Sequence, residues 1–294
     1  MADQVNTLPD RPPAADAARG GKLAVLIRNP RAMAGLLAVA SVILLAVLGP
    51  FLAPYSPLDF IDAPFQPPSE SSWLGSDALG RDVLSRILWG GYRVLAFSAL
   101  ATFLGVALGS FLGIFAGYEE GAVDELVMRL LDVLIAVPQI ILVLLFVSIV
   151  GPEPWLILIM VAVNHVPSVA RVVRSATLKV AKEDYVRFAE LIGTARRRII
   201  FREILPNVLG VILVETGLRF TYSIALIAGL GFLGFGTQPP TADWGLLINE
   251  NRIGLTLNPL PVLVPVVLIA ILTIGTNLFT DALGRVLTGR DTEA

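Results

Sequence analysis

Six long apolar runs limit the folds that are open to this chain. An α-helix needs about 20 apolar residues to cross the hydrocarbon core of a bilayer, because it rises only ~1.5 Å per residue. The runs that reach or approach this length are residues 32–53, 94–117, 126–150, 154–170, 207–235 and 259–280. The sequence therefore predicts an all-α integral membrane protein with six transmembrane helices.

The composition also favours a membrane protein over a soluble one. Of the 294 residues, 55% are hydrophobic and only 16% are charged, whereas a soluble domain carries about 25% charged residues. There are too few charged side chains to cover a soluble globule of this size. The mean hydropathy of +0.76 agrees with this interpretation.

The counts of single residue types exclude several kinds of chemistry. The chain has no cysteine and one histidine, His165, so it cannot build a disulfide framework, a cysteine nucleophile or a zinc motif with paired histidines. The net charge of −2 argues against nucleic acid as a partner. The sequence also has no G-x-x-x-x-G-K-[ST] phosphate loop. We therefore expect no catalytic, cofactor or metal site in this chain, and energy for active work has to come from a partner.

The distribution of Lys and Arg predicts the orientation, since cytoplasmic loops carry an excess of both. If both termini are cytoplasmic, the inner segments hold sixteen basic residues, nine of them in loop 171–206, and the outer segments hold four. We therefore expect both termini in the cytoplasm. The first apolar run exceeds the roughly 7–15 residues of a signal-peptide core, so we expect it to remain as an anchor.

The segments outside the spans complete the expected organisation. Residues 1–31 lack apolar periodicity and are expected to form a disordered cytoplasmic tail. The first span, residues 32–53, is followed by an external loop over residues 54–93. A five-helix transmembrane core is expected over residues 94–285, and residues 286–294 form a second cytoplasmic tail.

The external loop ends in an amphipathic pattern. Apolar residues that fall on one helical face are Leu79, Val83, Leu84, Ile87 and Leu88. Arg81 and Arg86 belong to the opposite, polar face, and Trp89 and Tyr92 follow. The pattern predicts a helix over residues 77–92 at the membrane interface. Two roles stay open at this point, a packed lid over the bundle and a gating element.

The inner loop 171–206 carries a second amphipathic segment. The apolar positions at i, i+3, i+4 and i+7 are Tyr185, Phe188, Ala189 and Ile192. Asp184 is placed to cap the start of this helix and Gly193 its end. Two helical turns are not stable alone in water, so the segment has to dock on its own bundle, on anionic lipid or on a cytoplasmic partner. We expect Pro206 to break the helix where the fifth span begins.

The same loop resembles that of a known family of transport proteins. The order Asp184-Tyr185-Val186, Gly193 and then Ile204-Leu205-Pro206-Asn207 is similar to the EAA loop of the permeases of binding-protein-dependent ABC importers. In that family the loop forms a coupling helix that lies in a cleft of the ATPase subunit. The Glu-Ala-Ala that names the loop is replaced here by Arg187-Phe188-Ala189, which enlarges the apolar face.

Two further blocks resemble the dipeptide, oligopeptide and nickel branch of this family, and the C-type of its two permeases. One is WLGSDALGRDVLSR at residues 73–86, and the other is GFLGFGTQPP at residues 231–240, followed by Trp244-Gly245. The closing NLFTDAL at residues 277–283 also fits. The resemblance extends from about residue 28 to residue 285.

The resemblance implies a subunit of the bacterial inner membrane that forms half of a translocation pathway. The implied partners are a homologous second permease, two ATPase subunits that bind ATP and Mg, an external solute-binding protein and the lipid bilayer. The implied cargo is a di- or oligopeptide, with nickel or another small peptide-like solute as the alternative. The implied coupling residues are Asp184, Tyr185, Arg187, Phe188, Ala189, Ile192, Gly193, Leu205 and Pro206.

Four polar residues inside the apolar runs are candidates for the translocation pathway. Asn164 and His165 lie in the fourth run, where His165 either faces the pathway or bonds a carbonyl freed by Pro167. Glu215 and Arg219 are four residues apart in the fifth run. We expect them to pair within the bundle, with contact to the substrate as the alternative.

Two rival functions belong to other classes. An intramembrane enzyme would need a nucleophile and a base at bilayer depth, but His165 is the only histidine and no G-x-S-x-G accompanies it. An ion-driven carrier often shows an internal repeat with broken helices, and no such repeat is evident in the sequence.

Overall fold

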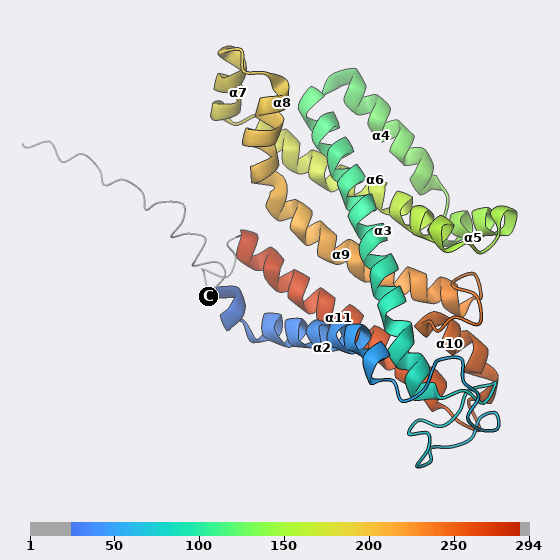
Figure 1. Ribbon diagram of the computed structural model, residues 1–294. Helices are drawn as coiled ribbons and strands as arrows, with labels where there is room; N and C mark the ends of the chain where they lie inside the picture. The colour runs from blue at the N-terminus through green and yellow to red at the C-terminus, as the bar shows by residue number, and fades with distance from the viewer. Residues whose placement is uncertain (1–24, 289–294) are drawn as a thin grey trace, which may run out of the picture.

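The computed structural model describes residues 25–288, and these residues form an α-helical bundle without a β-strand (Figure 1). The expectation of an all-α protein is confirmed. The elements are α2 (Pro30–Leu52), α3 (Val83–Glu119), α4 (Gly121–Ala136), α5 (Gln139–Val150), α6 (Pro154–Ala181), α7 (Asp184–Leu191), α8 (Arg196–Ile199), η1 (Ile200–Ile204), α9 (Leu205–Phe232), α10 (Trp244–Asn251), η2 (Arg252–Gly254) and α11 (Leu260–Thr288).

Five helices of the described chain are long and apolar enough to cross a membrane, and one bent helix pair forms a broken span or a re-entrant loop. The five are Pro30–Leu52, Val83–Glu119, Pro154–Ala181, Arg196–Phe232 and Leu260–Leu287. The predicted continuous helix over residues 126–150 is wrong, because α4 and α5 meet there at a bend of 77°. The cause is Pro138, which holds the preceding Val137 in an extended conformation and starts α5. Counted as one bent span, α4 and α5 bring the candidate spans to six.

The centre of the bundle is the contact between α3 and α6. Four glycines recur at every fourth position on the face of α3 that meets α6, namely Gly105, Gly109, Gly113 and Gly117. A Cβ atom added at Gly105 or Gly113 would lie 2.6 Å from a carbonyl oxygen of α6. The two helices therefore touch through their backbones, as small residues allow in membrane proteins. The sequence analysis missed this spacing, although Gly-x-x-x-Gly is a known packing motif.

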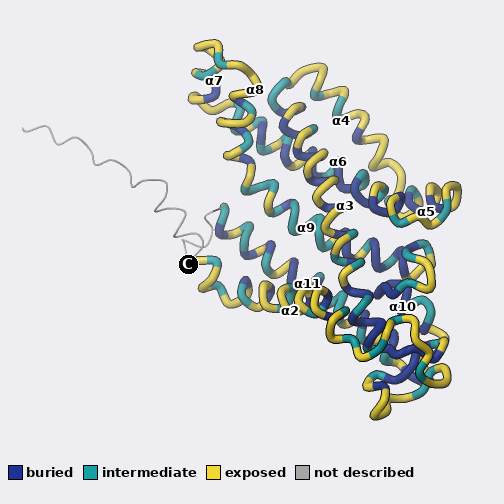
Figure 2. Tube along the Cα trace, viewed as in Figure 1, coloured by how far each residue is buried: buried dark blue, intermediate teal, exposed yellow. Residues whose placement is uncertain are grey.

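The other helices surround this pair (Figure 1). The two outer helices α2 and α11 lie side by side, with Gly35 and Gly275 at their contact. α4 and α5 lie on the other side of α3 and α6, and much of their surface is exposed (Figure 2). One end of the bundle carries α7 and α8 (the α7 end), and the opposite end carries α10 and loop 53–82 (the α10 end).

The predicted interfacial helix over residues 77–92 is wrong in its bounds and in its environment. α3 begins only at Val83, where Asp82 caps it by accepting a hydrogen bond from the Ser85 amide, and it continues directly into the span. The expected polar face is buried, with Arg81 and Arg86 almost fully enclosed. Residues 77–80 form a turn, and Arg81 and Asp82 form isolated β-bridges. Loop 53–82 covers the α10 end, with residues 72–82 mostly buried and residues 53–71 mostly exposed.

Burial of these arginines is possible because carboxylates neutralise them. Arg86 Nη1 lies 2.5 Å from Asp77 Oδ2 and 2.7 Å from Glu250 Oε2, and Arg81 Nε lies 2.8 Å from Asp77 Oδ2. Burial alone would raise the pKa of the Asp77 carboxyl, but the Arg81 backbone hydrogen bond and the charges of Arg86 and Arg81 outweigh it and lower that pKa below its ordinary value.

Hydrogen bonds tie α3 and this cover to α10 and to the residues before α11. The Ala78 amide of the cover donates to the Asn251 side-chain oxygen of α10 over 2.8 Å. The Trp244 indole N–H donates to the Ile87 carbonyl over 2.9 Å. The Asn258 amide nitrogen donates to the carbonyls of Gln66 and Leu74, each over 3.1 Å. The block at residues 73–86 that carries the family resemblance is thus a structural clamp at the α10 end.

The fifth span is continuous from Arg196 to Phe232, so the expected break at Pro206 is wrong. The chain passes from α8 into α9 through one π-helical turn, η1, in which the Leu205 amide donates to the Ile200 carbonyl. Pro206 has no N–H, and its ring crowds the carbonyl four residues earlier. The wider turn just before it accommodates the ring without ending the helix.

Candidate functional site

The short helix α7 stands at the tip of the bundle (Figure 1), and its inner face packs against the bundle. Val186 is fully buried in an apolar cluster, and Ala189 packs beside it. The buried residues that surround Val186 in this cluster include Val173, Ile199, Ile204 and Val208. Because these come from α6, α8, η1 and α9, the inner face of α7 is docked on its own bundle.

The opposite face of α7 is an apolar surface with nothing packed against it. We call Tyr185, Phe188, Leu191 and Ile192 the α7 patch; all four are exposed, Phe188 by 62% and Leu191 by 85%. Three residues of the predicted stripe are in it, but the fourth, Ala189, faces inward. Sequence reasoning missed Leu191 on the outside and Val186 on the inside, because the periodicity of two turns does not say which face the bundle covers.

The ends of α7 are formed differently from each other. Gly193 has φ +75° and follows the last turn; its amide donates to the Glu190 carbonyl over 2.9 Å, and the Thr194 amide donates to Ala189 over 3.0 Å. This is a Schellman motif, so the predicted role of Gly193 as a cap is confirmed. The predicted capping by Asp184 is wrong: Glu183 holds the cap position without a side-chain hydrogen bond, and Asp184 is the first helical residue.

Contacts from the neighbouring helices orient α7 and α8. The Asn207 side-chain amide at the start of α9 donates to the Tyr185 hydroxyl over 3.1 Å. Arg196 Nη1 lies 2.8 Å from the carboxylate of Glu119 at the end of α3. Leu205 packs partly against the Val186 cluster, whereas Pro206 is exposed. Both thus lie beside the α7 patch and not within it.

Basic side chains lie beside the α7 patch. On α7 itself Arg187 is exposed, and α8 and η1 expose further arginines beside a hollow of about 400 Å³. The arginines that line this hollow are Arg197, Arg198 and Arg202. The guanidinium of Arg197 lies 5.9 Å from the ring centroid of Phe201. Glu183, Asp184 and Glu190 are exposed beside the patch as well, so this end offers an apolar centre with a rim that carries charges of both signs.

A chain of polar side chains crosses the interior between α6, α9 and α3. His165 Nε2 lies 2.8 Å from the Ser223 hydroxyl, which lies 2.8 Å from the Thr102 hydroxyl. All three are buried. His165 thus bonds a hydroxyl of another helix and not a carbonyl freed by Pro167. Its neighbour Asn164 is half-buried and its side chain makes no hydrogen bond to the described residues.

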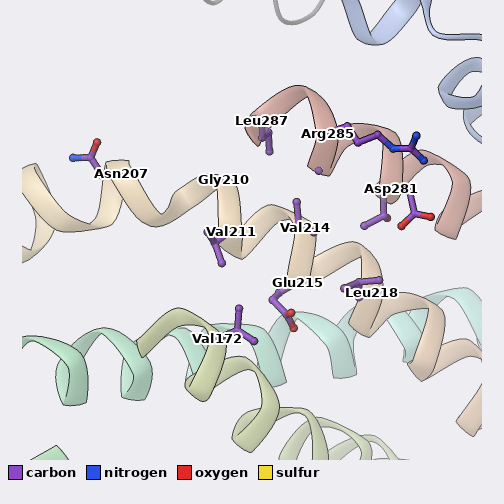
Figure 3. A pocket seen from close by; sticks show the side chains of 12 residues that line it. Val172, Asn207, Gly210, Val211, Val214, Glu215, Leu218, Asp281, Arg285 and Leu287 are labelled. Atoms are coloured by element: carbon purple, nitrogen blue, oxygen red, sulfur yellow. The ribbon is translucent and has the colours of Figure 1, made fainter. Parts of the chain in front are cut away.

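The pair Glu215 and Arg219 forms as expected, with Arg219 Nε 3.0 Å from Glu215 Oε2. Glu215 also borders a groove of about 560 Å³ between α9 and α11. Figure 3 shows Glu215 on the side of α9 that faces Val172, while Asp281 projects from α11. Sequence reasoning did not find Ser223, Thr102 or this groove, because lone hydroxyls in apolar runs carry no pattern.

A second cavity, of about 390 Å³, lies between the start of α5 and the last turns of α9. From α5 it is lined by Gln139 and Ile140, the two residues that follow the bend at Pro138. From α9 it is lined by residues that include Tyr222 and Gly229. Among the residues that the structure describes, no group of three or more His, Asp and Glu side chains is placed to hold a metal ion.

These features define a class: a polytopic helical membrane subunit with a docking helix at one end and an interior that carries polar side chains. Residues 109–290 match the family of binding-protein-dependent transport system inner membrane components. Residues 22–68 match the N-terminal transmembrane domain of oligopeptide transport permease C. The chain therefore belongs to the inner membrane components of binding-protein-dependent transport systems.

Relatives of known name agree with this membership. The chain is 36% identical to the glutathione transport system permease protein GsiD of Pectobacterium atrosepticum over 259 residues, which is 87% of this chain and 86% of that protein. It is 37% identical to GsiD of Escherichia coli over 258 residues, which is 87% of this chain and 85% of that protein. The chain is thus a permease subunit of an ABC importer, a multi-pass protein of the bacterial inner membrane, and a transport component rather than an enzyme.

The fold itself is shared with a solved transporter. The inward-facing MetNI methionine ABC transporter matches in one crystal form with a TM-score of 0.53 at 17% identity, over 67% of this chain and 96% of that one. A second crystal form gives a TM-score of 0.50 at 16% identity, over 65% and 93% of the two chains. At this identity the likeness concerns the fold alone.

Proposed function

We propose that this permease forms half of a translocation pathway for short peptides, together with a homologous second permease. Two ATPase subunits, which bind ATP and Mg, drive it, and an external solute-binding protein delivers the cargo. The choice of cargo is supported by the named relatives, since glutathione is a tripeptide, and by the match to an oligopeptide permease domain. Nickel or another small peptide-like solute is the alternative within the family.

The observation that carries the coupling role is the α7 patch. A helix of eight residues is too short to be stable alone, and here one face is held by Val186 while the other is left apolar and exposed. A partner that covers this face gains apolar burial without having to fold the helix first. We infer that an ATPase subunit lies on the α7 patch, so that its motion on binding ATP moves α7 and, through the Val186 cluster, α6 and α9.

The proposed orientation places the α7 end and both termini in the cytoplasm. Of the four basic residues assigned to the outer side, Arg81 and Arg86 are buried in ion pairs with carboxylates. They are not free surface charges, so the outer side keeps only Arg93 and Arg252. Three arginines of the inner segments, Arg171, Arg174 and Arg196, are also paired with carboxylates, so pairing reduces the count on both sides and the excess of Lys and Arg stays on the inner side.

The test is transport by the reconstituted complex. The chain, the partner permease, the ATPase subunits and the binding protein are purified together into vesicles that contain ATP on the ATPase side, and uptake of radiolabelled tripeptide and of nickel is measured. We expect ATP-dependent uptake of tripeptide that excess unlabelled tripeptide suppresses and nickel does not. Uptake of nickel without uptake of tripeptide would show that the cargo is nickel and not a peptide. Uptake without ATP would refute an ATP-driven function.

A further inference from the structure

One face of α9 carries ionisable and hydroxyl side chains at the depth of the membrane. Residues that alternate at intervals of four and three positions form one stripe along a helix. On α9 this stripe is Glu215, Arg219, Tyr222, Leu226, Gly229 and Leu233. It begins with the ion pair, passes Tyr222 near the middle of the span and ends at the cavity beside α5.

Arg219 is held in place but only partly used by its partners. Its Nε donates to Glu215 over 3.0 Å, and its guanidinium carbon lies 5.3 Å from the ring centroid of Tyr222. Its two terminal nitrogens make no hydrogen bond to the described residues. A guanidinium binds a carboxylate best through such a pair of parallel donors. The guanidinium of Arg219 is therefore oriented by Glu215 and Tyr222, and its two terminal nitrogens are available to bind an anion.

This face does not suit contact with lipid. Tyr222 is 58% exposed in the single subunit and Arg219 is partly exposed. Hydroxyl and guanidinium groups near the centre of a span are costly against hydrocarbon and normally face protein or a water-filled space. The Glu215–Arg219–Tyr222 face is thus directed toward the interior of the assembled transporter.

The cavity next to Tyr222 is suited to an apolar group. Ile140, Leu226 and Leu233 contribute apolar walls, and Gln139 contributes an amide. A Cβ atom added at Gly229 would meet nothing within 4 Å, so this position opens into space. Ten residues of helix separate Gly229 from Arg219, or about 15 Å. An extended tripeptide is about 10 Å long, so with its side chains it can reach from one to the other.

We propose that this α9 face is a cargo-binding site in which Arg219 pairs with a carboxylate of a short peptide while the cavity between α5 and α9 takes one of its apolar side chains. This inference rests on the proposed function, which names short peptides as cargo, and it adds the residues that recognise them. The bend at Pro138 is part of the site, because it places Gln139 and Ile140 opposite Gly229.

The apolar half of the site is tested by filling the cavity. Gly229→Leu places a side chain in the cavity, and its Cβ meets no atom of the chain within 4 Å. The matched control is Gly210→Leu on the same helix, where an added Cβ also has room, since its nearest neighbour is 3.7 Å away in the groove toward α11. In the reconstituted complex we expect Gly229→Leu to lower uptake of a Gly-Phe-Gly peptide about tenfold relative to tri-glycine. Gly210→Leu should leave that ratio at the wild-type value.

The charged half is tested with the double variant Glu215→Gln/Arg219→Gln, which removes both members of the pair so that no lone buried charge remains. Wild-type complex should favour a peptide with a free terminal carboxylate over its amide. The double variant should lose about tenfold of this preference, the size of one charge-assisted contact. Because the binding protein is the same in both complexes, a change in the ratio belongs to the permease. If the double variant does not assemble, Gly229→Leu decides alone.

The outcomes separate this inference from the proposed function. If wild-type complex transports no peptide with ATP, the proposed function fails. If it does so and Gly229→Leu keeps both uptake and the cargo ratio, the cargo site is wrong. If Gly229→Leu prevents the two permeases from co-purifying, the partner permease fills the cavity and the cargo site is again wrong.

Discussion

Replacing Phe188 by Asp should uncouple transport from ATP hydrolysis while leaving the chain folded. Phe188 is 62% exposed, so a partner that covers it removes about 100–150 Å² of side-chain surface from water, since a whole aromatic residue buries 150–250 Å². At about 25 cal/mol per Å² this amounts to about 3 kcal/mol, or roughly a hundredfold in the association constant. Aspartate also has to be desolvated or protonated in the contact, which adds to the loss.

The assay compares uptake of tripeptide and cargo-stimulated ATP hydrolysis in reconstituted complexes. Phe188→Asp should lose both responses, while the thermal unfolding of the purified chain stays unchanged because Val186, and not Phe188, fixes α7 to the bundle. Arg187→Ala is the matched control: it removes an exposed charge from the same helix outside the α7 patch and should retain most of the uptake. Wild-type uptake by Phe188→Asp in an intact complex would refute docking of the ATPase on the α7 patch and leave the lipid surface as its partner.

Three other predictions concern the α10 end and the orientation. Arg86→Met removes one of the two arginines that neutralise the buried Asp77 and the partly buried Glu250 and should lower the free energy of unfolding by about 3 kcal/mol in detergent; an unchanged melting temperature would contradict the clamp. Burial raises the pKa of Asp243 to about 6, against hydrogen bonds from Leu246 and Gly245 that lower it. In the unfolded chain this carboxyl ionises near pH 4, before it does so in the folded protein. Rising pH therefore lowers the free energy of unfolding by up to about 3 kcal/mol between about pH 4 and 6, with no further loss above pH 6. Asp243→Asn, which keeps a cap, should gain stability relative to wild type over that window, whereas a difference that stays constant with pH would refute it. Because the chain has no cysteine, Glu70→Cys and Glu190→Cys can be labelled singly in intact cells; a membrane-impermeant maleimide should react with the first only, and labelling of the second would reverse the orientation.

The buried network at the α10 end also explains a motif that resemblance alone leaves unexplained. The charged residues of this motif have a structural role: Asp77 is shared by Arg81 and Arg86, and Glu250 of α10 completes the network. Such a network costs desolvation and stabilises only when each member is paired. It thus fixes how loop 53–82 lies on α10 more than it adds to stability.

The sequence by itself determined what depends on neighbouring residues. Runs of about 20 apolar residues are sufficient for membrane spans because each helix satisfies its own backbone. The end of α7 was predictable because its Schellman motif is local. The amides of Gly193 and Thr194 donate to carbonyls no more than five residues earlier in the chain. The pairing of Glu215 with Arg219 was likewise local, being one turn of α9.

The bend between α4 and α5 was within reach of the same reasoning. Val137 precedes Pro138 and is therefore disfavoured in a helical conformation. The prediction of one helix over residues 126–150 gave more weight to the continuous apolar run than to this restriction. Pro206 shows the opposite outcome, since the same residue type left the fifth span continuous through a π-helical turn. A proline in the sequence therefore indicates where helical geometry is perturbed, while the packing around it decides whether the helix ends, bends or continues.

Only the tertiary structure decided which face of each amphipathic segment is covered. The pattern over residues 77–92 separates polar from apolar side chains, but Arg86 is buried because Glu250, 164 residues away, lies against it. The same holds for Val186, which is covered by α6 and α9, and for His165, whose partner Ser223 is 58 residues away. Periodicity indicates that the two faces of a helix differ in polarity. Which face is buried depends on contacts between residues far apart in the chain, and those contacts form only when the helices pack together.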